Sequence, residues 1–253
     1  MRVTSPWRLI NHIISGGAIF LISAQLRAAE IKVIGDSPLE PAIMKVVPLF
    51  EQRTHTHVVL SFNPSPAVKK RIESGEHADV LLIQPDFVEE LAQSGKVRGG
   101  DMPIFGRVGV GLGNRVDSPA HDISTPEKLR QTLLGADMLV FNNVMSGNAF
   151  AKILDRLGIA DALKQRIVRT SPLGIFDPVL KGKGDDIAAG TMPLIATTPG
   201  IKLLGPLPGD LQSFLSYTAV LMINSEQRDV AEQFIQYLSS PEAKSALTAN
   251  GVN

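Results

Sequence analysis

The 253-residue chain contains no cysteine, which excludes disulfide bonds and the cysteine-linked lipid anchor of bacterial surface lipoproteins. Aromatic residues make up only 5% of the sequence, so broad stacking surfaces for sugars or peptides are not favoured. No apolar run reaches the roughly 18–20 residues that a membrane-spanning helix requires. The chain also lacks an internal repeat, a low-complexity tract and a long block of like charge.

Basic and acidic side chains balance at 25 each. Loss of residues 1–29 would remove three arginines and no acidic residue, which leaves a slight excess of negative charge. Such a balance provides no electrostatic basis for binding nucleic acid or anionic lipid. We therefore expect no nucleic-acid partner.

Residues 1–29 have the order of features that is typical of a secretory signal peptide. Arg2 and Arg8 precede an apolar stretch over residues 10–22, and small residues follow up to Ala29. The alternative is a single N-terminal membrane anchor. We expect cleavage and a soluble mature protein in a bacterial periplasm, an oxidising compartment that permits disulfides but does not require them.

The rest of the chain alternates short apolar segments with amphipathic ones. The apolar segments predict strands over residues 31–35, 57–62, 78–83, 107–113, 138–142, 166–170, 186–189, 202–207 and 217–224. The amphipathic segments predict helices over residues 41–51, 66–73, 86–93, 126–134, 149–157, 229–238 and 241–249. This alternation predicts an α/β fold in which helices cover parallel sheets.

Polar turns follow three of the predicted strands, over residues 36–38, 63–65 and 142–148, and each contains a serine shortly before a helix. Parallel α/β sheets bind ligands at the carboxyl ends of their strands, where helix N-termini offer N–H groups to an anion. Serine and asparagine also cap helices whatever the function, which explains any one of these turns. Because three such turns occur together, a shared oxyanion site explains them as well as helix capping does.

Four stretches carry a resemblance to a known family, and they cover residues 78–97, 122–129, 154–159 and 234–243. They are similar to the molybdate-binding protein family of bacterial solute importers, and the resemblance extends over about residues 30–251. It implies the type II periplasmic-binding-protein fold, in which two α/β lobes are joined by two crossing strands and hold the ligand between them.

The resemblance also implies a domain organisation. Residues 30–107 and 219–253 would form the first lobe, and residues 108–218 the second. The crossing strands, which act as the hinge, would be residues 107–113 and 217–224. The family implies a monomer that delivers its ligand to the membrane subunits of an ABC transporter.

The family holds its tetrahedral oxyanion with serine hydroxyls and backbone N–H groups, because buried N–H dipoles at helix ends stabilise negative charge without a cation. The family's pocket tyrosine has no counterpart here, and Thr191 is the nearest hydroxyl in the matching region. The ligand-binding residues implied by the resemblance are Ser37, Ser65, Asn143, Met145, Ser146, Gly147 and Thr191. Neither a cofactor nor a metal ion is expected.

Two alternatives to a transport protein remain. Aconitate isomerase, a periplasmic enzyme acting on a small tricarboxylate, also resembles this family, and it needs a group that removes a proton from carbon and returns one. Asp36, Asp185 and Asp186 are the candidate proton-transfer residues, although ordinary solvated turns and strand edges also explain them. A sensing module that presents its closed lobes to a membrane partner is the second alternative. His55 and His57 lack a third nearby ligand, so no metal site is predicted there.

Overall fold

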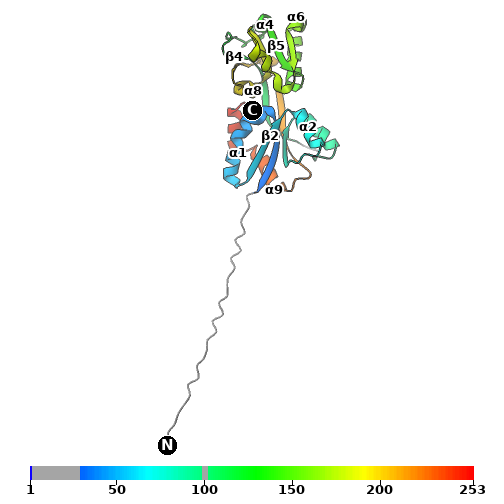
Figure 1. Cartoon of the computed structure of the whole chain (residues 1–253), viewed down its shortest axis with the longest axis vertical. Helices are drawn as coiled ribbons and strands as arrows, with labels where there is room; N and C mark the ends of the chain where they lie inside the picture. The colour runs from blue at the N-terminus through cyan, green and yellow to red at the C-terminus, as the bar shows by residue number, and fades with distance from the viewer. Residues whose placement is uncertain (2–28, 99–101) are drawn as a thin grey trace.

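The computed structural model describes Met1 and residues 29–98 and 102–253. The predicted signal peptide therefore lies almost entirely outside the described residues. These residues form two α/β lobes, one above the other in Figure 1. Within the described ranges, no helix combines the length and apolar character needed to cross a membrane.

The first lobe is built from both ends of the described chain. Its first part alternates strand and helix, and its last part packs two helices against the same sheet, with the side chains of α1 forming one buried face. Its elements are β1 (Glu30–Asp36), η1 (Ser37–Leu39), α1 (Glu40–Thr54), β2 (His57–Asn63), α2 (Ser65–Glu73), β3 (Val80–Ile83), α3 (Pro85–Gln93), β9 (Phe214–Leu221), α9 (Arg228–Tyr237) and α10 (Pro241–Ala249).

The second lobe is formed by the middle of the chain. A long strand, β4, leads into it from the first lobe, and short helices cover its sheet. Its elements are β4 (Ile104–Arg115), α4 (Pro126–Gly135), β5 (Met138–Asn142), α5 (Met145–Arg156), α6 (Ala160–Leu163), η2 (Lys164–Arg166), β6 (Ile167–Thr170), η3 (Pro172–Gly174), α7 (Asp177–Lys181), β7 (Asp186–Thr191), α8 (Met192–Thr197), β8 (Ile201–Pro206) and η4 (Gly209–Leu211).

Neighbouring strands follow the order β2-β1-β3-β9-β4-β7-β5-β6, and β8 pairs with β4. The outer strands of each lobe are parallel, as predicted: β1 pairs with β2 and β3, and β5 pairs with β6 and β7. The strands that connect the lobes pair antiparallel with their neighbours, because β4 and β9 run between the lobes in opposite directions.

The hydrophobic cores show where the chain crosses between lobes. Along β4, Val108 packs into the core of the first lobe and Val110 into that of the second. On the return, Leu211 belongs to the second core and Leu215 to the first. The return crossing therefore lies at about residues 212–214, several residues before the boundary predicted at 218/219.

Two helices beside the sheet edge differ from the sequence-based expectation. Helix α5 begins at Met145 rather than at residue 149, and α8 begins at Met192, where no helix was predicted. A proline early in α8 suits a first helical turn because that turn needs no N–H donor there. Both helices therefore start immediately beside the carboxyl ends of β5 and β7.

We predict that Phe50→Ala lowers the free energy of unfolding by about 3–5 kcal/mol, because the ring is buried and no other side chain fills its place. Its ring centre lies 5.1 Å from that of Phe234 and 5.4 Å from that of Tyr237. Urea unfolding followed by circular dichroism measures the change. The control is Met44→Ala on the exposed face of the same helix, which should shift the value by less than about 0.5 kcal/mol. Equal effects at the two positions would contradict this packing.

Candidate functional site

The candidate site is a small pocket between the lobes, where the carboxyl ends of five strands from both sheets converge. Its volume is about 50 Å³, several times the roughly 10–15 Å³ that one water molecule needs. It is lined by Asp36, Ser37, Pro38, Pro64, Ser65, Pro66, Gln84, Phe87, Asn142, Val144, Met145, Ser146, Pro172, Leu173, Ile175, Thr191, Leu194 and Leu215. The pocket can therefore accept a small ligand in contact with both lobes.

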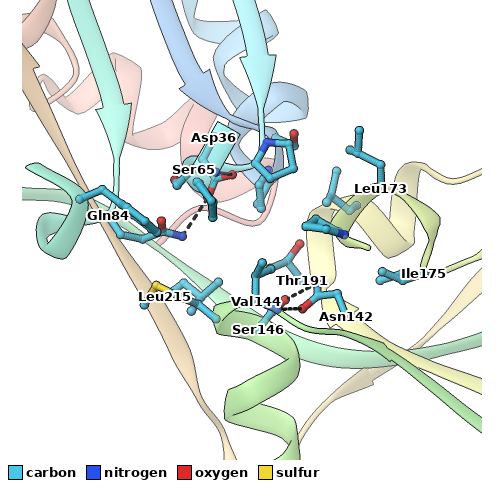
Figure 2. A pocket seen from close by; sticks show the side chains of 18 residues that line it. Asp36, Ser65, Gln84, Asn142, Val144, Ser146, Leu173, Ile175, Thr191 and Leu215 are labelled. Carbon is cyan, nitrogen blue, oxygen red and sulfur yellow. Dashed lines mark hydrogen bonds between the residues drawn. The ribbon is translucent and has the colours of Figure 1, made fainter. Parts of the chain in front are cut away.

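Five of the seven predicted ligand-binding residues line this pocket: Ser37, Ser65, Met145, Ser146 and Thr191. Figure 2 shows Ser65 on one side, with Ser146 and Thr191 facing it from the other. The structure thus brings together residues that are up to 154 positions apart in the chain. Their role as ligand contacts stays a prediction.

Asn143 and Gly147 do not line the pocket. The N–H of Asn143 donates to the carbonyl of Thr170 at 3.1 Å, which ties the loop to the neighbouring strand β6. Gly147 lies so close to β5 that an added Cβ would be 1.9 Å from the carbonyl oxygen of Asn142. Glycine at this position therefore allows the first turn of α5 to approach the end of β5.

Asp185 and Asp186 do not reach the pocket. They lie at the start of β7, whereas Thr191 at its carboxyl end lines the pocket; five residues of extended strand span about 16 Å. The Asp185 carboxylate is 2.8 Å from His121, and that of Asp186 is 3.4 Å from Arg115. Burial raises the pKa of Asp186, and the positive charge of Arg115 opposes this shift.

Asn142 organises the second-lobe wall of the pocket, whereas sequence reasoning named its neighbour Asn143 as a ligand-binding residue. Its Oδ1 accepts hydrogen bonds from the N–H groups of Val144 at 3.1 Å and Gly147 at 3.0 Å. Its Nδ2 donates to Ser146 Oγ at 2.9 Å (Figure 2). Because Ser146 Oγ accepts from Asn142, its own proton is free to point at a ligand.

The remaining polar group of the pocket is the Asp36 carboxylate, at the end of β1 and 4% exposed. Its Oδ1 accepts from the N–H of Ser65 at 3.0 Å. Its Oδ2 accepts from Gln84 Nε2 at 2.8 Å and from the Tyr217 hydroxyl at 3.0 Å. Burial raises the pKa of Asp36 to about 6, and the hydrogen bonds from Tyr217 and Ser65 oppose this shift only in part.

Gln84 and Tyr217 were missed by sequence reasoning. Gln84 is the first polar residue after the apolar strand β3 and directly precedes a proline that begins α3, the same pattern that marked the serine turns. Tyr217 carried no local signal, because its hydroxyl meets Asp36 only through the pairing of β9 between β3 and β4. The Asp36 carboxylate in turn raises the pKa of Tyr217, although burial contributes most.

Buried hydroxyl groups without partners lie on opposite walls of the pocket. Ser65 is 1% exposed and Thr191 3%, and among the described residues neither Ser65 Oγ nor Thr191 Oγ1 has a hydrogen-bond partner. A buried polar group without a partner costs about 1–3 kcal/mol of folding free energy. Two such groups therefore line one cavity from different lobes with unused hydrogen-bonding capacity.

The pocket contains no cationic side chain among its lining residues. The start of α5, a 12-residue helix, supplies positive potential instead, since its aligned peptide dipoles leave a partial positive charge at the N-terminus. No hydrogen bond within the described ranges uses the N–H groups of Met145 and Ser146. The second-lobe wall therefore offers neutral donors to a negatively charged ligand.

The two lobes are in contact around the pocket. Met145, at the start of α5 in the second lobe, packs against the hydrophobic core of the first. Leu173 and Ile175, from the segment after β6, add an apolar side to the pocket (Figure 2). In the described part of the chain, no cluster of three or more His, Asp or Glu side chains has the geometry to hold a metal ion.

We predict that ionisation of Asp36 destabilises the ligand-free protein, because its folded pKa of about 6 lies above the unfolded value near 3.8. The stabilisation from the protonated carboxyl is complete below the unfolded pKa and is lost as the pH rises through about 6. Between pH 4 and pH 8 the free energy of unfolding should fall by about 2 kcal/mol more in the wild type than in Asp36→Asn. Thermal and urea unfolding across this range would measure the difference in unfolding free energy between the wild type and Asp36→Asn. A difference that does not change with pH would contradict the prediction.

Comparison with known proteins agrees with this architecture. Aconitate isomerase from a Pseudomonas species is 25% identical over 248 residues, which is 93% of this chain and 94% of the relative. The molybdate-binding protein of Azotobacter vinelandii is 21% identical over 236 residues, with 91% of this chain and 92% of the relative covered. The solved structure of the A. vinelandii periplasmic molybdate-binding protein superposes with a TM-score of 0.72 at 20% identity and covers 88% of this chain and 98% of that chain.

These likenesses confirm the predicted two-lobed type II periplasmic-binding-protein fold and the resemblance to molybdate-binding proteins. The family described as bacterial extracellular solute-binding protein matches residues 31–253, which is nearly all of the described chain. Because this match spans both lobes and the strand ends that converge on the pocket, the chain belongs to the bacterial extracellular solute-binding protein family.

Proposed function

We propose that this protein captures a small anion with oxygen ligand atoms, an inorganic oxyanion or an organic carboxylate, between its two lobes. The observation that carries the proposal is the pair of unpartnered buried hydroxyls, Ser65 Oγ and Thr191 Oγ1, on opposite walls of one cavity. The free N–H groups at the start of α5 support it, since they stabilise negative charge without a cation. A ligand that touches both walls favours the closed arrangement of the lobes by its contacts alone.

The same proposal includes the location and the partner. Residues 1–29 direct the protein to the periplasm as a cleaved signal peptide, and the mature chain works as a monomer. The closed lobes, with the anion between them, are presented to the membrane subunits of an ABC importer. Members of the family matched by this chain are described as extracellular solute-binding proteins, which supports this placement.

We predict that the double variant Ser65→Ala/Thr191→Val binds its anion at least tenfold more weakly, because hydrogen bonds to a charged group contribute about 1.5–3 kcal/mol each. The free variant should be as stable as the wild type or more stable, since the removed hydroxyls have no partner in the protein. Titration calorimetry with the best anion from a thermal-shift screen of oxyanions and carboxylates measures affinity, and the same thermal shift without ligand measures stability.

The matched control is Ser118→Ala. Ser118 is also buried, and its Oγ has no hydrogen-bond partner in the described structure, but it lies outside the pocket. This variant should keep the affinity of the wild type. Unchanged affinity in the double variant, or equal losses in the double variant and the control, would remove Ser65 and Thr191 from the binding site.

A second candidate function is isomerisation of a small unsaturated carboxylic acid. The observation that favours it is the Asp36 carboxylate in the pocket wall, whose pKa of about 6 is suited to removing and returning a proton near neutral pH. The 25% identity to aconitate isomerase over 93% of this chain supports it further. In this role Asp36 is the proton-transfer residue, and the hydroxyl and N–H groups of the opposite wall hold the carboxylate groups of the substrate.

We predict for this second function that the wild-type protein interconverts cis- and trans-aconitate, with a loss of at least about 100-fold in kcat for Asp36→Asn, since general acid–base catalysis typically contributes 10²–10⁴-fold. Proton NMR of the two isomers follows the reaction directly. Asp185→Asn serves as the control, because this aspartate lies at the far end of β7. If the wild type binds aconitate without converting it, the isomerase function is contradicted and solute capture is the only proposed function that stands.

A further inference from the structure

We propose that the Asp36 carboxylate makes this site selective for anions that carry an O–H group and donate its proton to Asp36. This inference rests on the proposed function and specifies the ligand class of the same pocket. The ligand class comprises hydroxycarboxylates and hydrogen-bearing oxyanions such as hydrogen phosphate. Fully ionised anions without an O–H group bind only when Asp36 takes up a proton.

Counting the acceptor positions of Asp36 supports this. A carboxylate has about four lone-pair positions for hydrogen bonds. Three are used: Oδ1 accepts from the Ser65 N–H, and Oδ2 accepts from Gln84 and Tyr217. One position on Oδ1 is not used by these three bonds, although the Ser65 hydroxyl and the Ser37 N–H also lie close enough to Asp36 to lower its pKa; Asp36 is part of the pocket wall. A ligand O–H group can therefore complete the acceptor capacity of Asp36.

The charges around Asp36 make this position decisive. The groups that face it are Ser37 from η1, Ser65 from the start of α2, Gln84 directly after β3 and Tyr217 from β9. All four are uncharged in this setting, because burial and the neighbouring carboxylate keep the Tyr217 hydroxyl protonated. No cation lines the pocket to screen Asp36 from a ligand. An anionic oxygen placed against the ionised carboxylate is thus repelled, whereas an O–H group in the same place forms a hydrogen bond.

The opposite wall then serves the ionised part of the same ligand. The Thr191 hydroxyl and the N–H groups of Met145 and Ser146 can all donate hydrogen bonds to a negatively charged oxygen. The pocket therefore has a proton-accepting carboxylate in the first lobe, beside the Ser65 hydroxyl, and only donors from Thr191, Met145 and Ser146 in the second. A ligand with an O–H group at one end and an ionised oxygen at the other matches both sides.

Two pairs of probes test this on the purified full mature chain by titration calorimetry at pH 8. Inorganic phosphate and sulfate share a tetrahedral shape and the same main charge at this pH, but only phosphate retains an O–H group. Malate and succinate differ by a single hydroxyl group. In each pair that binds, we expect the member with the O–H group to bind at least about tenfold more tightly. The other member would leave the Asp36 carboxylate unpaired and facing an anionic oxygen, which strongly disfavours its binding.

Asp36→Asn should bring the two members of a pair to within about threefold of each other, mainly through tighter binding of sulfate or succinate, because an uncharged amide no longer repels an anion. The matched control is Asp79→Asn. Asp79 is a buried carboxylate as well, and it accepts from the Lys32 N–H at 2.8 Å and from Ser225 Oγ at 2.6 Å outside the pocket. This control should lose stability but keep the wild-type preference within each pair.

The pH dependence gives a test that needs no variant. A fully ionised anion binds only with uptake of a proton at Asp36, so the affinity of the wild type for sulfate or succinate should fall about tenfold between pH 7 and pH 8. The affinity for malate should stay constant over this range, because its hydroxyl brings the proton.

The outcomes separate the two proposals. Equal affinity within a pair at pH 8, with no pH dependence for the member lacking an O–H group, would overturn the selectivity at Asp36 and leave anion capture standing. Failure of all four probes to bind, while another anion of the thermal-shift screen binds, would overturn only the selectivity; failure of every anion in the screen would overturn both. A preference within a pair that survives in Asp36→Asn would also overturn this inference, since it would place the discrimination elsewhere in the pocket.

Discussion

The buried Asp36 carboxylate is the interaction on which the site depends. Its three hydrogen bonds tie the end of β1 to the start of α2, to the residue after β3 and to β9, the strand that returns from the second lobe. A charge with so little access to solvent is costly, which is why its pKa moves toward neutrality. The first-lobe wall is therefore held in place by a group whose charge state is itself sensitive to what occupies the pocket.

The second-lobe wall is built on different principles. Asn142 fixes the first turn of α5 through neutral hydrogen bonds, and Gly147 lets that turn approach the end of β5. The resulting wall presents donors rather than acceptors. The two walls therefore differ in their hydrogen-bonding groups: a buried carboxylate lies in the first-lobe wall and donors lie in the second, and the proposed selectivity rests on this difference.

This arrangement also connects the two functions that the comparisons suggest. Proton-donating groups opposite one buried carboxylate can capture an anion, and the same carboxylate is placed to exchange a proton with a bound acid. The family match and the shared fold are compatible with either outcome, because function in such folds is set by the residues at the strand ends. The identity of the side chains at those ends, rather than the scaffold, distinguishes a binding protein from an isomerase.

The sequence by itself determined the α/β class, the approximate limits of nearly every strand and the serine turns at the strand ends, since periodicity and turn chemistry are local properties. It located Ser37, Ser65, Ser146 and Thr191 near the site but named Asn143 instead of Asn142, because adjacent residues of one turn cannot be told apart without their hydrogen bonds.

Only the tertiary structure decided that Tyr217 and Gln84 meet Asp36, and that Asp185 and Asp186 lie far from it. Strand order and direction place these groups, and both arise from pairings between distant segments: Gln84 is 48 positions from Asp36, and Tyr217 is 181 positions from it. The pKa of Asp36 follows from the same long-range packing, because burial is a property of the assembled lobes and of no segment alone.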